Sequence, residues 1–177
     1  MRVTVVGSGY VGLVAGACFA ETGNDVVCAD VDEGKVAGLR RNELPIYEPG
    51  LEPLVRRNQE EGRLAFTTDI GAAVERADVV FIAVGTPAGE DGSADLHHVL
   101  DVARVIGQHL NGPKVIATKA TVPVGTAERV RRVIRAESKA PFSLCANPEF
   151  LKEGAAVEDF MHPDRVVVGV EDDRARE

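Results

Sequence analysis

A glycine-rich hexapeptide directly after a short apolar run most strongly constrains how this chain can fold. The apolar run is residues 3–6, and the hexapeptide consists of Gly7, Ser8, Gly9, Tyr10, Val11 and Gly12. A Gly-x-Gly-x-x-Gly pattern between a strand and a helix is typical of dinucleotide-binding domains. Its first glycine permits a tight turn, its second leaves room for a pyrophosphate, and its third lets helix and strand approach. We therefore expect this loop to bind a dinucleotide.

Apolar runs alternate with helical segments along the rest of the chain. Strands are expected near residues 2–6, 25–29, 64–67, 79–84, 114–118, 143–146 and 166–170, and helices near 10–22, 33–41, 51–60, 70–76, 95–110, 125–138 and 154–160. This alternation predicts an α/β domain of the doubly wound Rossmann type, with a mostly parallel sheet and helices on both faces. One domain is expected over residues 1–170. The charged residues 171–177 resemble the start of a truncated connecting helix, although a solvated C-terminus is an alternative.

An acidic residue ends the second expected strand. Asp30 follows Gly12 by 18 positions, where a carboxylate can hydrogen-bond the ribose hydroxyls of a bound dinucleotide. Because the same charge repels a 2′-phosphate, NAD is favoured over NADP as the cofactor. Lys35 is near enough in sequence to contact a ribose or a phosphate. Asp32 is more simply the N-cap of the helix that begins at Glu33.

Composition and charge narrow the classes of partner. Hydrophobic residues make up 45% of the chain and charged residues 27%, which is typical of a folded globular domain. An apolar stretch of about 18 residues, as a membrane span requires, does not occur, and no signal peptide is recognisable, so a cytoplasmic protein is expected. The net charge of −8 opposes nucleic-acid binding.

Cysteine and histidine spacing gives no indication of a metal site. Cys18, Cys28 and Cys145 are odd in number and lie in apolar stretches, so we expect three buried thiols without a disulfide. The histidines are expected at the surface or at helix ends, and no metal is predicted. They are His97, His98, His109 and His162.

Further polar residues follow the later strands, at the edge where a doubly wound sheet binds its ligands. The fourth strand ends in residues 84–86, which are Val84, Gly85 and Thr86; they are expected beside the nicotinamide, although turn chemistry alone is an alternative. Thr121 and Glu149 follow the fifth and sixth strands. These two side chains suit a hydroxyl contact and a proton transfer, and ordinary loop residues are an equally good interpretation of their spacing.

Three longer segments carry a resemblance to a known family. They are Leu-Pro-Ile-Tyr-Glu-Pro-Gly-Leu at 44–51, Lys-Ala-Thr-Val-Pro-Val-Gly-Thr at 119–126 and Asn-Pro-Glu-Phe-Leu-Lys-Glu-Gly at 147–154. Together with the glycine hexapeptide they resemble the UDP-glucose 6-dehydrogenase family, along the chain from Met1 to about Gly169. Relatives that oxidise GDP-mannose or UDP-N-acetylmannosamine share the architecture. The first and third segments are most similar to the UDP-glucose enzymes.

The resemblance implies oxidation of UDP-glucose to UDP-glucuronate with two NAD and a covalent thioester intermediate. It implies NAD contacts by residues 7–12, Asp30, Lys35, residues 84–86, Thr121 and Glu153. It also implies substrate contacts by Glu149, Phe150, Leu151, Lys152 and Glu153. Glu149 would help to activate the water that hydrolyses the thioester, and Thr121 would position that water or the reacting hydroxyl.

The chain departs from the family pattern in one decisive respect. The family's nucleophilic cysteine lies in a second half beyond a long central helix that also forms the homodimer, and this sequence stops where that helix would start. A smaller departure is Ala120, where serine commonly precedes the threonine. We therefore expect NAD binding without turnover, and a dimer only for the complete enzyme. An NAD-binding half of a related sugar-nucleotide enzyme and a non-catalytic dinucleotide-binding module are the alternatives.

Overall fold

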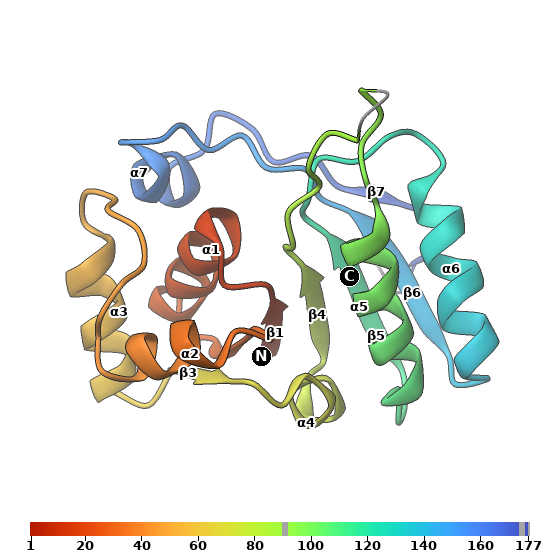
Figure 1. Cartoon of the computed structure of the whole chain (residues 1–177), viewed down its shortest axis with the longest axis horizontal. Helices are drawn as coiled ribbons and strands as arrows, with labels where there is room; N and C mark the ends of the chain where they lie inside the picture. Colours follow the sequence, from red (N-terminus) through yellow and green to blue (C-terminus); the bar gives the residue numbers. More distant parts are fainter. Residues whose placement is uncertain (90–91, 174–175, 177) are drawn as a thin grey trace.

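A single seven-stranded sheet organises the molecule (Figure 1). The computed structural model describes residues 1–89, 92–173 and 176. The strand order is β3-β2-β1-β4-β5-β6-β7, in which β1 to β6 are parallel and β7 is antiparallel to β6. The strands are β1 Arg2–Val6, β2 Asp25–Ala29, β3 Leu64–Thr67, β4 Val79–Ile82, β5 Lys114–Thr118, β6 Phe142–Ala146 and β7 Gly169–Val170. The order reverses between β1 and β4, which confirms the predicted doubly wound fold.

Helices cover both faces of this sheet. The helices are α1 Tyr10–Glu21, α2 Glu33–Arg40, α3 Leu51–Glu60, α4 Ile70–Arg76, α5 His97–Gln108, α6 Thr126–Glu137 and α7 Ala156–Met161. One core joins β1 and β2 to α1, α2, α3 and α7, and another joins β4, β5 and β6 to α4, α5 and α6. The strands are apolar on both sides because each side meets a layer of helices.

The C-terminal part differs from the sequence-based expectation. The strand expected over 166–170 shrinks to two residues, because β6 pairs with it only at Cys145 and Ala146. Three valines of that run, residues 166–168, are instead exposed at 65%, 42% and 53%. Helix α7 begins at Ala156, two residues later than expected. Of the connecting helix expected over 171–177, residues 174, 175 and 177 lie outside the described residues, so that helix stays a prediction.

The prediction of three buried thiols is wrong for one cysteine. Cys18 and Cys28 are fully buried, but Cys145 is only half-buried. Side chains alternate between the two faces of a strand. Leu144 packs into the core with α5 and α6, so Cys145 faces the opposite side of β6, where the covering is incomplete.

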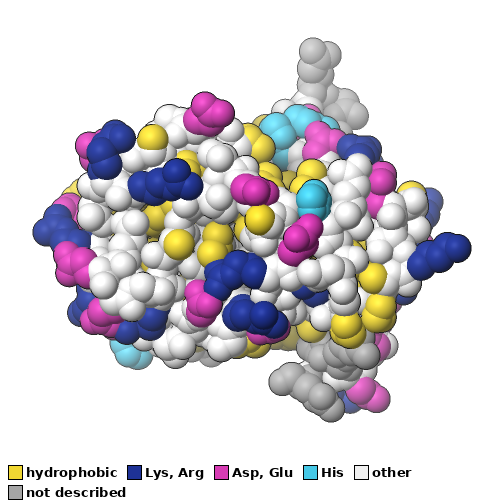
Figure 2. Space-filling model, turned by 90° about the horizontal axis from the view of Figure 1, so that it is seen from below, with side chains coloured by type: hydrophobic (Ala, Val, Ile, Leu, Met, Phe, Trp, Pro, Cys, Tyr) yellow, Lys and Arg dark blue, Asp and Glu magenta, His cyan; other side chains and the backbone are white. Residues whose placement is uncertain are grey.

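Charged side chains are mixed on the surface shown in Figure 2. Basic and acidic groups alternate there without a continuous basic area. Within the described part of the chain, no helix combines the length and hydrophobicity that crossing a bilayer requires.

Candidate functional site

The glycine loop fills the space between β1 and α1 so tightly that side chains are excluded at two of its positions. Gly7 has a φ of +103°, and its N–H donates a hydrogen bond to the Ala29 carbonyl over 2.8 Å. A Cβ atom on Gly12 would lie 1.8 Å from the Gly7 carbonyl oxygen. A Cβ on Gly9, in contrast, would meet no atom within 4 Å. The loop is therefore closed against the protein but open outward at Gly9, where a pyrophosphate requires space.

The start of α1 provides hydrogen-bond donors to this open space. Gly9 is the N-cap and offers no side chain to the first-turn N–H groups. Helix N-termini of this kind bind phosphate groups, because their unpaired N–H groups and dipole favour an anion. Ser8 Oγ is the one side-chain oxygen or nitrogen in the described residues that is buried without a hydrogen-bond partner. Buried hydroxyls are normally paired, so this oxygen fits a site completed by a ligand or a water.

Asp30 lies beside the glycine loop with its carboxylate already engaged. Its Oδ2 accepts hydrogen bonds from Ser8 N–H over 2.7 Å and from Lys35 Nζ over 2.8 Å, and its Oδ1 accepts from Asp32 N–H over 3.1 Å. Burial acts to raise the pKa of Asp30, but these hydrogen bonds and the charge of Lys35 together lower it. The structure thus brings together Asp30, predicted to hold a ribose, and Lys35, predicted to contact a ribose or a phosphate. Asp32 caps α2 through Lys35 N–H, as predicted.

The segments after β4 and β5 meet at the same edge of the sheet. Thr86 Oγ1 donates a hydrogen bond to the Thr121 carbonyl over 3.1 Å. Val84 is half-buried, whereas Gly85 and Thr121 are exposed. The predicted nicotinamide contacts therefore lie next to the threonine predicted to touch the reacting group, and their roles stay predictions.

The predicted substrate residues form one open turn after β6. Glu149 is half-buried, and its Oε2 accepts a hydrogen bond from Leu151 N–H over 2.7 Å. Phe150 is 49% exposed, while Leu151 packs partly against the first core. Lys152 donates to Asp159 through its backbone N–H over 2.9 Å. Glu153 is exposed. Three side chains of the turn are therefore exposed, and those of Glu149 and Leu151 are half-buried.

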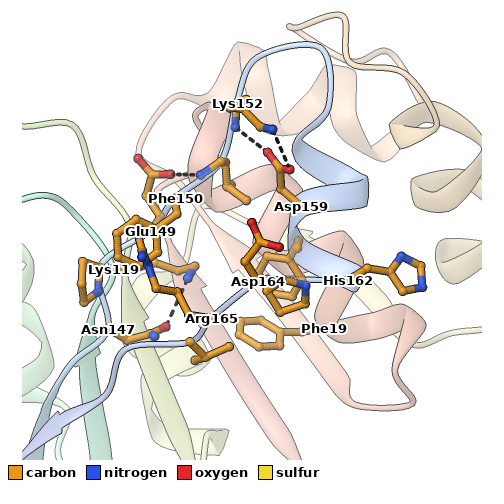
Figure 3. A pocket seen from close by; sticks show the side chains of 15 residues that line it. Phe19, Lys119, Asn147, Glu149, Phe150, Lys152, Asp159, His162, Asp164 and Arg165 are labelled. Carbon is orange, nitrogen blue, oxygen red and sulfur yellow. Dashed lines mark hydrogen bonds and ion pairs between the residues drawn. The ribbon is translucent and has the colours of Figure 1, made fainter.

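A cavity of about 650 Å³ opens beside this turn (Figure 3). Residues 147–152 and 162–166 line it, together with Phe19, Lys119, Asp159 and Phe160. Lys119 is 6% exposed, and its Nζ donates a hydrogen bond to Asn147 Oδ1 over 3.1 Å. Burial lowers the pKa of Lys119, against the opposing charge of Glu149. Sequence reasoning did not assign Lys119 or Asn147 to a site, although both lie inside the segments that carried the resemblance.

Glu48 is a third residue that sequence reasoning missed. It is 4% exposed, and its Oε2 accepts hydrogen bonds from Tyr10 Oη over 2.6 Å and Gly154 N–H over 2.9 Å. Its Oε1 accepts from Ala156 N–H over 2.9 Å. The Tyr10 hydroxyl donates to this carboxylate, so the Tyr10 side chain faces Glu48, and its predicted cofactor contact stays a prediction.

None of the cysteines in this chain has the properties of a nucleophile at neutral pH. Burial raises the pKa of Cys18 to about 12 and that of Cys28 to about 12. Burial also raises the pKa of Cys145, although Lys119 opposes the shift. Reactive thiols have a lowered pKa and an electropositive, accessible setting. The three cysteines are therefore held as neutral thiols.

The histidines occupy the positions that were expected of them. His97 and His98 open α5, and His109 and His162 cap the ends of α5 and α7. Among the described residues, no group of three or more His, Cys, Asp or Glu side chains is arranged to hold a metal ion.

A family model matches the whole chain. The model describes the UDP-glucose/GDP-mannose dehydrogenase family, NAD binding domain, and the match covers residues 1–177. The UDP-glucose 6-dehydrogenase of Rhizobium meliloti (strain 1021) is 55% identical over 181 residues, which cover 100% of this chain and 41% of that protein. The chain thus spans about two fifths of the length of this relative.

Solved structures of related enzymes have the same fold. A UDP-glucose dehydrogenase from the archaeon Pyrobaculum islandicum superposes with a TM-score of 0.96 at 45% identity, over 98% of this chain and 41% of that chain. A ternary complex of GDP-mannose dehydrogenase from Pseudomonas aeruginosa gives a TM-score of 0.96 at 35% identity, over 99% of this chain and 42% of that chain.

Proposed function

The chain belongs to the UDP-glucose/GDP-mannose dehydrogenase family as its NAD binding domain, and we propose that it serves a UDP-glucose 6-dehydrogenase. The observation that carries the proposal is the glycine loop. It is closed by Gly7 and Gly12, open at Gly9, and flanked by the ionised Asp30. UDP-glucose is preferred over GDP-mannose as the substrate because the UDP-glucose 6-dehydrogenase relative is 55% identical and the GDP-mannose enzyme only 35%.

We assign the cofactor contacts as follows. The N–H groups at the start of α1 would hold the pyrophosphate. Asp30 and Lys35 would hold a ribose. Residues 84–86, Thr121 and Glu153 would lie toward the nicotinamide half. NAD, when bound, supplies the acceptor for hydride, and every other contribution comes from side chains and backbone of the protein.

The substrate side follows from the turn after β6. Residues 149–153 would contact the sugar nucleotide, and Glu149 would act as general base toward a water, because an ionised carboxylate can take a proton from a nearby water. Thr121 would hydrogen-bond the reacting hydroxyl or that water. The nucleophile of the complete enzyme would come from the part of the relatives that extends beyond the matched residues, since the thiols of Cys18, Cys28 and Cys145 are held neutral.

Location and assembly belong to the same proposal. The free thiols of Cys18, Cys28 and Cys145 suit a reducing compartment, so we place the protein in the cytoplasm. The complete enzyme would form a homodimer, and nucleic acid and membranes are not proposed as partners.

Calorimetric titration of the 177-residue chain with NAD tests the cofactor site, with NADP as the control. UDP-glucose and GDP-mannose are then added separately to the NAD-saturated protein. We expect binding of NAD, weaker binding of NADP, and a weak or absent response to either sugar nucleotide. Equal affinity for NAD and NADP would contradict the assignment of Asp30.

Activity is tested in a chimera. This chain replaces the matching residues of the Rhizobium meliloti enzyme, and the reduction of NAD is followed with each sugar nucleotide. Turnover of GDP-mannose in preference to UDP-glucose would contradict the proposed substrate and favour the GDP-mannose alternative. NAD binding by the chain, combined with an inactive chimera under both substrates, would favour a non-catalytic dinucleotide-binding module.

A further inference from the structure

Glu48 lies where the N-termini of three helices meet. Tyr10 is the first residue of α1, and its hydroxyl donates to Glu48. The Glu48 carbonyl accepts a hydrogen bond from the N–H of Leu51, the first residue of α3, over 3.1 Å. Ala156, the first residue of α7, donates its N–H to the Glu48 carboxylate. One residue of the loop between α2 and α3 therefore contacts the start of three helices.

These contacts connect the two halves of the candidate site. Tyr10 follows Gly9 directly, at the open side of the glycine loop. Gly154 follows Glu153 directly and has a φ of +89°, so its N–H points from a left-handed turn toward the Glu48 carboxylate. Along the sequence, Glu48 is 38 residues from Tyr10 and 106 residues from Gly154. It thus joins the cofactor loop to the turn that carries the predicted substrate residues.

We infer that Glu48 is a positioning residue that sets the place of the substrate turn relative to the cofactor loop through Tyr10, Gly154 and Ala156. The inference deepens the proposed function and rests on it. Glu48 touches neither ligand in this assignment and acts on the cofactor loop through Tyr10.

The charge of Glu48 suits this role. Burial acts to raise the pKa of Glu48 and the charge of Asp159 acts in the same direction, but the three hydrogen bonds outweigh them and lower the pKa. An ionised carboxylate accepts hydrogen bonds only, so it satisfies three donors at once. A glutamine has an NH₂ group in place of one carboxylate oxygen. This donor would face a backbone N–H or the Tyr10 hydroxyl, which are donors themselves. Glu48→Gln therefore disrupts the hydrogen bonds of Glu48 with little change in side-chain size.

The test uses the 177-residue chain and two measurements. Calorimetry gives the affinity for NAD, and NMR gives the hydrogen-exchange rates of the Gly154 and Ala156 amides. We expect Glu48→Gln to weaken NAD binding about tenfold and to speed exchange at both amides by about tenfold or more, because charged hydrogen bonds are lost. Tyr10→Phe should weaken NAD binding about threefold and leave the two amides nearly unchanged.

The double variant distinguishes positioning from general destabilisation. If Glu48 acts on the cofactor loop through Tyr10, the double variant should bind NAD no more than about twofold weaker than Glu48→Gln alone. Two single substitutions serve as controls for Glu48→Gln. Glu43→Gln removes an exposed carboxylate paired with Arg41 in the same loop, and Ile134→Val destabilises the remote second core. Neither control should change NAD affinity.

Several outcomes would overturn the inference. Faster amide exchange with unchanged NAD affinity would reduce Glu48 to a local structural contact, and additive losses in the double variant would exclude a route through Tyr10. If Glu48→Gln does not fold, normal NAD affinity of Tyr10→Phe overturns the inference. Failure of the unmodified chain to bind NAD counts against the proposed cofactor site instead. In that case, unchanged exchange rates of the Gly154 and Ala156 amides in Glu48→Gln would still show that the Glu48 carboxylate does not hold the turn in place.

Discussion

The glycine loop after β1 and the turn after β6 lie at the same edge of the sheet but are built in opposite ways. The loop is enclosed by its neighbours, so that an added Cβ on Gly7 would lie 2.8 Å from the Ala83 carbonyl oxygen. The turn leaves Phe150 about half exposed, and the valines at 166–168, which follow α7, are exposed as well. The predicted cofactor loop is thus formed within one packed unit, whereas the predicted substrate residues lie on a partly exposed turn.

This difference predicts opposite tolerance to substitution, and the largest effect is expected at Gly12. Gly12→Ala places a methyl group 1.8 Å from the Gly7 carbonyl, so it should lower the free energy of unfolding by about 3 kcal/mol or more and abolish NAD binding. Urea denaturation and calorimetry measure the two effects. Gly9→Ala is the matched control, because its methyl group enters open space. It should keep normal stability and lose only NAD affinity, and a stable Gly12→Ala protein would refute the tight packing.

Substitutions in the turn after β6 should change turnover and leave stability and NAD affinity nearly unchanged. Glu149→Gln in the chimeric enzyme should slow turnover about 100-fold, as expected for loss of a general base, while NAD affinity and stability of the chain change little. Thr121→Ala should slow turnover by a smaller factor. Steady-state kinetics measures the turnover of these variants, and calorimetry measures their NAD affinity. Normal turnover of both variants would remove these residues from the chemistry.

Substitution of Asp30 tests how the cofactor site discriminates between NAD and NADP. Asp30→Ala removes the proposed ribose acceptor and frees Lys35, so NAD affinity should fall about 10- to 100-fold and discrimination against NADP should relax. Titrations with both dinucleotides measure the change. Lys35→Met, which removes the other member of the ion pair, is the comparison. Unchanged affinity for both dinucleotides in Asp30→Ala would show that the ribose lies elsewhere.

The smallest effect is expected at the opposite edge of the sheet, where Arg2 and Asp78 pair. Hydrogen bonds from Arg2 lower the pKa of Asp78 to about 2. The pair stabilises the fold above the ordinary Asp pKa of 3.8, and this contribution is lost as the pH falls through about 2. Both side chains are largely exposed, so Asp78→Asn should cost less than about 1 kcal/mol at pH 7.

Urea unfolding of the unmodified chain and of Asp78→Asn between pH 5 and pH 2 measures this dependence. The difference in free energy of unfolding between the two proteins should shrink toward the acid end. A difference that grows with acidity would contradict the assigned pKa shift.

Local patterns were sufficient to predict the doubly wound α/β fold and the place of the glycine loop between β1 and α1. The runs at 2–6, 25–29 and 114–118 became strands with the expected bounds, and Asp32 became the expected helix cap. These features depend on residues close together in the chain. The strand expected at 166–170 failed because its length depends on how much of β6 is available for pairing.

Glu48 and Lys119 could not be assigned from local pattern. Glu48 meets partners 38 to 108 residues away, and Lys119 meets Asn147 across 28 residues. The exposure of Cys145 likewise depends on which face of β6 is covered. Alternation along a strand indicates that two faces exist, but it does not say what packs against each of them.

The sequence by itself determined the α/β alternation, the glycine loop, the acidic end of β2 and the family of this chain. These are set by local conformational preferences and by residue types at fixed short spacings. Tertiary structure alone decided that Tyr10 faces Glu48, that Lys119 lies beside a cavity and that the turn after β6 stays open. Hydrogen bonds and burial between distant segments exist only once the sheet has brought those segments together.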